Sequence, residues 1–271
     1  MLTKGRMLTN YHTHSSWCDG RSSPEEIVRS AIAKGFAEIG FSSHAMLPGD
    51  ALDWAVTAAK APHYAAEIRA LAAKYAGAIV VRCGVEADYV PSSATPSHAA
   101  YQAIAPDYII GSVHFVVADD GAWVPVDHTP EKLMGGIRDH FGGDSEAFVR
   151  RYFAAEREMV AAFDFEIVAH PDLVRKFNGK SPYFDERSAW YREELEQTAA
   201  AIADSGKLVE VNTGAIARGW LDDAYPSAEF RGRLRERGVK FILSSDAHSA
   251  EALDCAFDRF GAAEAYVRLR C

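Results

Sequence analysis

Seven times along this chain, a short apolar run ends in residues that can bind a metal ion, and a helical pattern follows. The runs close on Tyr11-His12-Thr13-His14, Ser43-His44, Val85-Glu86, Val113-His114, Ala169-His170, Val211-Asn212 and Ser245-Asp246-Ala247-His248. In a barrel of parallel strands, the carboxyl ends of all strands meet at one face, so side chains far apart in the sequence converge there. The pattern therefore predicts a metal-dependent barrel enzyme.

Length and composition favour a single domain spanning residues 1–271. The chain has 271 residues, 48% of them apolar, and α/β barrels commonly occupy this length as one domain. Its 38 acidic residues outnumber its 29 basic residues, which argues against a nucleic-acid partner. We expect a small-molecule substrate instead. An anionic substrate remains compatible with this charge, because bound metal ions reverse the local field.

Neither a membrane protein nor a disulfide-rich secreted protein is expected. No apolar stretch reaches the ~18 residues that a membrane span requires. The four cysteines, Cys18, Cys83, Cys255 and Cys271, form no CxxC pair, and no signal peptide precedes them. We therefore expect a cytoplasmic location. The sequence leaves the oligomeric state open.

Strands and helices alternate along the chain, which predicts a parallel sheet that closes into a barrel. After the first run, strands are expected over residues 37–41, 79–85, 108–115, 165–169, 208–211 and 241–244. Helices are expected from Ser22-Ser23-Pro24 to Gly35 and over residues 64–75, 98–104, 145–163, 186–205, 227–237 and 250–269. No glycine-rich phosphate-binding motif follows the first strand, so a nucleotide cofactor is disfavoured.

The helical and strand periodicities both fail between residues 116 and 143. Asp119-Asp120-Gly121 marks a turn between two short extended pieces, residues 115–118 and 122–126. We expect this segment, at about 116–143, to be an insertion over the active face.

The histidines carry the strongest chemical signal. His12 and His14 are two residues apart, so on a strand both imidazoles point to the same face and can share one metal ion. Such a pair alone is weak evidence, because histidine has many other uses. The further candidates at strand ends make metal binding the favoured interpretation; they are His44, Glu86, His114, His170, Asp246 and His248. Four histidines lie on helices or in the insertion and are not expected to be ligands, namely His63, His98, His128 and His140.

The motifs together resemble those of the PHP (polymerase and histidinol phosphatase) superfamily over nearly the whole chain. The shared motifs are His12-Thr13-His14, Asp19-Gly20, Ser43-His44, Gly84-Val85-Glu86, His114, His170-Pro171 and Ser245-Asp246-Ala247-His248. The resemblance implies a distorted seven-stranded (β/α)7 barrel that holds two or three divalent metal ions at the carboxyl ends of its strands. Zinc, manganese and iron are the expected metals.

Three longer stretches resemble the monofunctional histidinol-phosphate phosphatases of this superfamily. They are residues 111–115, residues 169–177 and residues 210–214 followed by Tyr225-Pro226-Ser227. The resemblance implies hydrolysis of L-histidinol phosphate to L-histidinol and phosphate, a late step of histidine biosynthesis.

The resemblance also implies how the ligands are divided. The first metal would be held by His12, His14, Glu86 and Asp246; the second by Glu86, His114 and His170; and a third by Asp19, His44 and His248. Glu86 would bridge the first two metals. Two such metals are expected to activate a bridging hydroxide, because each lowers the pKa of bound water. Asp246 or His248 would then manage the proton transfers.

Two arginines are candidates for binding the substrate phosphate. Arg175 and Arg218 each follow a predicted strand closely enough to lie in loops at the active face. A guanidinium group offers a planar pair of donors for phosphate oxygens. Each residue could equally be an exposed loop arginine.

Two other functions stay open from the sequence alone. A related phosphoesterase that acts on another small phosphate ester or a nucleotide would keep the metals and change the recognition loops. A non-catalytic metal-binding module would usually have lost ligands, whereas here the set is complete.

Overall fold

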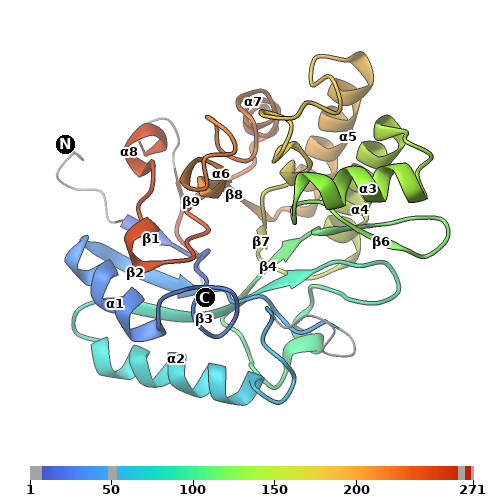
Figure 1. Ribbon diagram of the computed structural model, residues 1–271. Coiled ribbons are helices and arrows are strands. Elements are labelled where there is room, and N and C mark those ends of the chain that lie inside the picture. The colour runs from blue at the N-terminus through green and yellow to red at the C-terminus, as the bar shows by residue number, and fades with distance from the viewer. Residues whose placement is uncertain (1–7, 48–53, 262–265, 270–271) are drawn as a thin grey trace.

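The fold is built on one sheet of seven parallel strands (Figure 1). It is described by a computed structural model that covers residues 8–47, 54–261 and 266–269. The strands lie in sequence order: β1 (Leu8–Asn10), β2 (Phe36–Phe41), β3 (Val80–Asp88), β4 (Tyr108–Ser112), β7 (Ile167–Val168), β8 (Leu208–Asn212) and β9 (Phe241–Ser244). Every neighbouring pair is parallel. The seven predicted strands are thus confirmed.

The first and last strands meet at their carboxyl ends and close the sheet into a distorted barrel, as the sequence predicted. Thr13, just beyond β1, forms a parallel bridge with Ala247, just beyond β9. The N–H of His14 donates to the carbonyl oxygen of Ala247 at 2.8 Å. Below this seam, the side-chain amide of Asn10 donates to the hydroxyl of Ser245 at 2.6 Å. Candidate ligands from both ends of the chain are therefore brought side by side.

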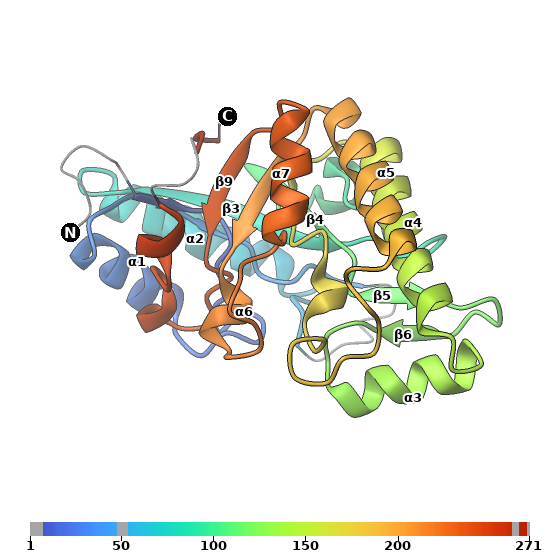
Figure 2. The same cartoon turned by 90° about the horizontal axis from the view of Figure 1, so that it is seen from above.

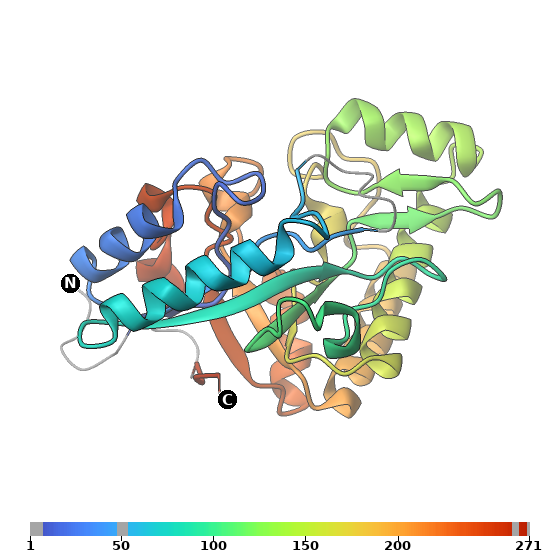
Figure 3. The same cartoon turned by 90° about the horizontal axis from the view of Figure 1, so that it is seen from below.

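Helices cover the outside of the sheet (Figures 1 and 2). The main ones are α1 (Pro24–Ala33), α2 (Ala61–Tyr75), α4 (Ser145–Ala162), α5 (Ala189–Ser205) and α7 (Ala228–Glu236). Figure 3 shows α2 lying along the long strand β3. Helix α1 begins as predicted, because Ser23 and Glu26 form a reciprocal capping box and Pro24 occupies the first turn. Among the described residues, no helix is both long and apolar enough to cross a membrane.

The barrel interior below the candidate site is filled by apolar side chains. They are Tyr11, Tyr108, Ile110, Ile167, Ala169, Ile242 and Leu269. The Tyr108 hydroxyl donates to the carbonyl oxygens of Tyr11 at 2.5 Å and Phe41 at 3.2 Å. Its ring lies where a side chain at Gly84 would be, since a Cβ there would overlap the ring atoms. These side chains therefore fill the interior beneath the carboxyl face.

The segment between β4 and α4 folds outside the seven-stranded sheet. Its two predicted extended pieces form an antiparallel hairpin of β5 (Phe115–Val117) and β6 (Trp123–Pro125). The strand predicted over residues 108–115 ends at Ser112, where the chain leaves the sheet for this hairpin. A helix that the sequence analysis missed, α3 (Pro130–His140), follows the hairpin. Thr129 caps it by accepting a hydrogen bond from the N–H of Lys132. The start of this helix could therefore have been predicted from the capping residue in the sequence.

The end of the chain differs most from expectation. A continuous helix over residues 250–269 was predicted, but the described residues of this range form only a 3-10 turn, Ala250–Ala252, and the short helix α8 (Phe257–Phe260). Between them, Ala256 has a φ of +55°, which interrupts the helix. Beyond the undescribed residues 262–265, Tyr266 forms a bridge to Phe241, and Leu269 is buried in the barrel interior. Tertiary packing thus overrides the helical pattern.

Smaller departures concern the helix termini and connections. Helix α5 begins at Ala189, after a Ser188 cap, and not at residue 186. A short helix, α6 (Gly214–Ala217), follows β8 without having been predicted. The expected helix over residues 98–104 is a 3-10 helix, His98–Tyr101, and a second 3-10 turn spans Leu173–Arg175.

One buried acid makes the stability of this fold dependent on pH. Glu156, on α4, is fully buried; one of its carboxyl oxygens accepts the Tyr152 hydroxyl at 2.8 Å, and the other has no hydrogen-bond partner among the described residues. Burial raises its pKa to about 8. Between its ordinary pKa and this raised value, the folded state holds a proton that the unfolded state releases. The unfolding free energy is therefore highest below the pKa of Glu156 in the unfolded chain and falls as the pH rises towards 8.

We predict that Glu156→Gln stabilises the protein relative to the wild type at pH 9 but not at pH 4.5. The expected difference in unfolding free energy is roughly 4 kcal/mol, since one pKa unit corresponds to about 1.4 kcal/mol. Urea unfolding at both pH values measures it. The exposed acid Glu146 on the same helix is the matched control. The unfolding free energies of Glu146→Gln and the wild type should differ by the same amount at both pH values. A pH-independent effect of Glu156→Gln would contradict the prediction.

Candidate metal centre

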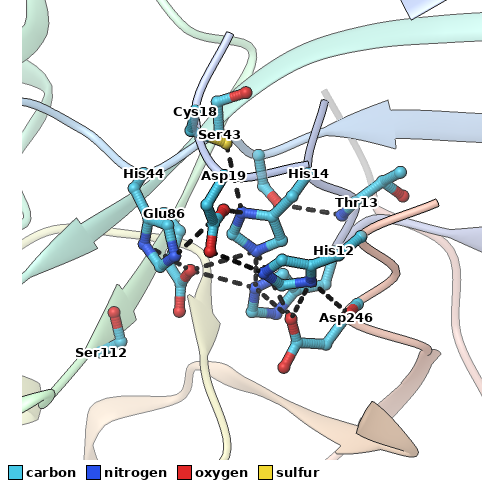
Figure 4. Close-up of polar contacts among 12 residues, drawn as sticks. His12, Thr13, His14, Cys18, Asp19, Ser43, His44, Glu86, Ser112 and Asp246 are labelled. Carbon is cyan, nitrogen blue, oxygen red and sulfur yellow. Dashed lines mark hydrogen bonds and ion pairs between the residues drawn. The ribbon is translucent and has the colours of Figure 1, made fainter. Parts of the chain in front are cut away.

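The structure brings all nine predicted metal ligands together at the carboxyl face of the barrel. They are His12, His14, Asp19, His44, Glu86, His114, His170, Asp246 and His248, and their ligand atoms form overlapping groups in which each atom lies within 4.8 Å of the others. Figure 4 shows the side chains of the first five of these and of Asp246 pointing towards a common centre. Strand-end placement therefore achieves the convergence that the sequence pattern predicted.

Glu86 lies at the middle of this cluster, and its two carboxylate oxygens face different histidines. Oε1 is 3.1 Å from Nε2 of His170 and 3.4 Å from Nε2 of His114. Oε2 is 3.2 Å from Nε2 of His12 and 3.4 Å from Nε2 of His14. The Glu86 backbone is fixed on β3 by pairing with the extension of β2, because Ala45 donates to its carbonyl oxygen at 2.8 Å. The carboxylate thus spans two groups of histidine nitrogens.

Asp246 completes the group around His12 and His14. Its Oδ1 is 3.4 Å from Nε2 of His14 and 3.8 Å from Nε2 of His12. The backbone of Asp246 has a φ of +51°, a left-handed conformation that is unfavourable for a residue with a side chain. Such strain persists only where surrounding contacts impose it, and it commonly marks functional sites.

The third group lies nearer the surface. Asp19 Oδ2 is 3.0 Å from Nε2 of His248, and its Oδ1 is 3.8 Å from Nε2 of His44. The Asp19 side chain is 36% exposed, whereas His12, His14 and Glu86 are at most 1% exposed. His44 also reaches inwards, with Nδ1 3.1 Å from Glu86 Oε2. This group is therefore the most open to solvent of the three.

The inner groups have the character of a cation site. Nε2 of His12 and Nε2 of His14 approach to 3.1 Å, and both face Glu86 Oε2, a buried oxygen without a hydrogen-bond partner among the described residues. His12 directs its other nitrogen, Nδ1, at Glu210, so Nε2 is the nitrogen that faces the ligand group. Burial, with His248 and His44 nearby, lowers the pKa of His14 to about 3, so this imidazole is neutral. Converging lone pairs and a carboxylate fit a divalent ion that accepts nitrogen and oxygen donors.

Two carboxylates outside the predicted set orient the ligands. Glu210, fully buried on β8, accepts from Nδ1 of His12 at 2.9 Å and from the N–H of His170 at 3.0 Å. Asp88 Oδ1 is 2.8 Å from Nδ1 of His114. Although burial opposes it, Asp88 and Glu86 raise the pKa of His114 to about 10. Asp88 follows Glu86 by two residues on one strand face, a spacing that could have revealed it from the sequence.

A cavity of about 780 Å³ opens above the ligands. Its lining combines seven of the candidate ligands with further side chains, namely Trp54, Phe115, Trp123, Pro125, Asp127, His128, Lys132, Leu173, Lys176, Ala215, Arg218 and Tyr225. Of these, Arg218 is one of the two arginines proposed from the sequence as phosphate contacts. The β5–β6 hairpin and its continuation thus form one wall, as expected for an insertion over the active face.

Arg218 lies at the edge of the ligand cluster. Its two terminal nitrogens contact the Asp246 carboxylate at 3.2 and 3.0 Å, and one of them is 3.1 Å from Nδ1 of His248. Although burial opposes it, Arg218 contributes to a pKa of Asp246 well below the usual range. Gly214 is required here, because a Cβ at that position would overlap Arg218 and Asp246.

Arg175 is placed differently from what the sequence suggested. Its side chain is 9% exposed and pairs with Glu186 at 2.6 Å and Asp172 at 3.4 Å. It is not among the described residues that line the cavity, whereas its neighbour Lys176 is. The 3-10 turn at Leu173–Arg175 directs the two consecutive basic side chains to different surroundings.

The remaining histidines lie outside the ligand groups of the described residues. His63, His98 and His140 are absent from the described metal-binding groups and from the cavity lining. His128 lines the cavity but contacts Lys132 at 3.2 Å and no candidate ligand. Cys18 lies 3.5 Å from His14, and burial raises the pKa of its thiol to about 11.

Comparison with known proteins identifies the family. A PHP domain matches residues 10–214, the range that contains seven of the nine candidate ligands. The chain belongs to the PHP domain family. Among curated relatives, this PHP protein is 30% identical over 247 residues to a "Probable histidinol-phosphatase" of Deinococcus radiodurans, covering 89% of the chain and 86% of the relative.

Solved structures show that the PHP fold extends over nearly the whole chain. A crystal structure from Listeria monocytogenes, described as a candidate histidinol phosphatase, superposes with a TM-score of 0.81 at 19% identity and covers 93% of this chain and 100% of that one. The histidinol phosphate phosphatase of Lactococcus lactis was solved with zinc, L-histidinol and phosphate. It has a TM-score of 0.67 at 24% identity, and the match covers 89% of this chain and 86% of that one.

We predict that Asp88→Ala weakens metal binding by roughly 10- to 100-fold, because a carboxylate that orients a ligating imidazole contributes about that much affinity. Competitive zinc titration with a chromogenic chelator measures the change. Asp119, an exposed acid at the hairpin turn, provides the control, and Asp119→Ala should leave the affinity unchanged. Equal affinities for Asp88→Ala and the wild type would show that Asp88 does not support the centre.

Proposed function

We propose that this PHP protein hydrolyses L-histidinol phosphate to L-histidinol and phosphate, as a step of histidine biosynthesis, with the help of two or three divalent metal ions. The observation that carries the proposal is the single carboxylate of Glu86, whose two oxygens face two separate histidine pairs at the base of a cavity. The relative from Deinococcus radiodurans, named for this activity, supports the choice of substrate.

In this proposal, the ligands divide as the family resemblance implied. His12, His14, Asp246 and Glu86 would hold the first metal; Glu86, His114 and His170 would hold the second; and Asp19, His44 and His248 would hold the third. The distances around Glu86 support the first two sets. The greater exposure of Asp19 makes the third site the most readily vacated. Zinc, manganese or iron suits these nitrogen and oxygen donors.

Bound metals would lower the pKa of water and neutralise part of the phosphate charge. The residues of the chain then provide position and further charge. Glu86 fixes the separation of the two inner sets, because one rigid carboxylate belongs to both. Arg218, whose terminal nitrogens contact Asp246 and His248, adds positive charge at the cavity edge, where it can pair with a phosphate oxygen. Lys176, which also lines the cavity, adds a second positive charge.

Proton transfer in the reaction is assigned to the Asp246–His248 side of the cavity. Both residues line it, and Arg218 contacts both. This places them beside the phosphate oxygens that Arg218 would hold, where the departing alkoxide needs a proton.

We predict that the metal-loaded protein releases phosphate from L-histidinol phosphate far faster than from p-nitrophenyl phosphate, and that Glu86→Ala reduces this turnover by roughly a thousand-fold or more. Phosphate release from both substrates, side by side, is the measurement. Comparable weak rates on both substrates would point to a phosphoesterase with another substrate, and absence of turnover in the wild type would favour a non-catalytic metal-binding module. Full activity of Glu86→Ala would exclude the bridging role.

The two arginines are expected to behave differently. Arg218→Ala should lower kcat/KM by roughly 100-fold, because a charge-assisted phosphate contact is lost. Arg175→Ala should leave kcat/KM nearly unchanged but lower the unfolding free energy by about 3 kcal/mol, since Asp172 is left buried without its partner. Steady-state kinetics and urea unfolding of both variants test this. A raised KM with unchanged stability in Arg175→Ala would restore Arg175 as a phosphate ligand.

A further inference from the structure

The wall of the cavity that the insertion forms carries a carboxylate without a role in the metal centre. Four acids line the cavity in the described part of the chain, and three of them, Asp19, Glu86 and Asp246, belong to the ligand cluster. The fourth is Asp127, two residues after the end of β6. Because a phosphate ester is anionic, a further negative charge beside it would weaken its binding. Asp127 therefore calls for an explanation that the hydrolysis itself does not supply.

The position of Asp127 is fixed by the metal centre. Strand β5 begins directly after His114, and the hairpin returns to the same residue, because the N–H of Val126 donates to the carbonyl oxygen of His114 at 2.9 Å. Asp127 is the next residue. The hairpin and α3 lie together at one end of the molecule (Figures 2 and 3). A side chain on this insertion is thus held at a constant distance from a candidate ligand.

The Asp127 carboxylate is ionised, and only one of its two oxygens accepts a hydrogen bond from the described residues. Lys176 donates to its Oδ2 at 3.0 Å and to its carbonyl oxygen at 2.7 Å, while no hydrogen bond from the described residues reaches Oδ1. Against the effect of burial, Lys176 and His114 hold the pKa of this carboxyl well below its usual range. The side chain remains 30% exposed to the cavity region. One carboxylate oxygen is therefore available to a cationic ligand.

The surroundings match a substrate with two opposite charges. Lys176 and Asp127 place a positive and a negative group side by side, and L-histidinol phosphate carries its ammonium group on the carbon next to the phosphorylated one. Phe115 and Trp123, whose ring centroids are 5.8 Å apart, add an apolar aromatic surface to the same wall. Such a surface suits the planar imidazole.

We propose that Asp127 binds the ammonium group of the substrate and thereby selects phosphate esters of amino alcohols over other phosphate esters. The inference rests on the proposed function, because it concerns the substrate of that same site. The alternative is that Asp127 only positions Lys176 for the phosphate. The two roles differ in one respect: a contact to the ammonium matters only for substrates that have one, whereas a role through Lys176 affects every phosphate ester.

The test compares Asp127→Asn with the wild type, both metal-loaded, on three substrates: L-histidinol phosphate, the corresponding imidazole alcohol phosphate without the amine, and p-nitrophenyl phosphate. We expect kcat/KM to fall by about 100-fold for L-histidinol phosphate and to stay within a few-fold for the other two. Asp127→Glu should recover part of the lost activity, because it keeps the charge. Asp120→Asn, at the exposed hairpin turn, is the matched control and should leave all three values unchanged.

Thermal unfolding and metal content of Asp127→Asn establish that it is folded and loaded. An equal loss on all three substrates would overturn the proposal in favour of positioning through Lys176, and unchanged kinetics would overturn it outright. Failure of the proposed function is distinguishable, because the wild type would then show no preference for L-histidinol phosphate before any variant is made.

Discussion

The crowding of nitrogen and carboxylate donors around Glu86 is the constraint on which the rest of the structure depends. A carboxylate buried among imidazoles is costly unless positive charge compensates it. The chain meets this cost with supporting groups: Glu210 orients His12 and fixes the His170 backbone, and Asp88 orients His114. Each of these carboxylates is itself buried within the sheet, so the strand order and the metal centre are inseparable.

Much of this arrangement was predictable because parallel strands impose it. Once seven strands share a direction, residues at their ends must meet, and the identity of those residues indicated the chemistry. The seven strands and the convergence of all nine candidate ligands follow from this rule. The hairpin was also readable, since Asp119-Asp120-Gly121 is a strong local turn signal.

The errors lie where distant contacts outweigh local pattern. The region after residue 250 has helical composition, yet Leu269 is needed to fill the barrel interior, and Tyr266 pairs with Phe241. Arg175 and Lys176 are adjacent in the sequence, but only the local turn decides which one reaches the cavity. The spacing of apolar residues along the sequence predicts neither of these two outcomes. Supporting residues such as Glu210 escaped notice for a related reason: they act on ligands from other strands, and no local spacing connects them.

Because β1 and β9 meet at the seam, the metal centre is complete only when both ends of the chain have folded together. Asn10 and Ser245, which meet below the seam, are 235 residues apart in the sequence. The group around His12 and His14 lacks Asp246 until the last strand has joined the sheet. Contacts between such distant residues form late, because a long loop must close first. A cation bound to His12, His14 and Asp246 would link the ends of β1 and β9 and so stabilise the closed barrel.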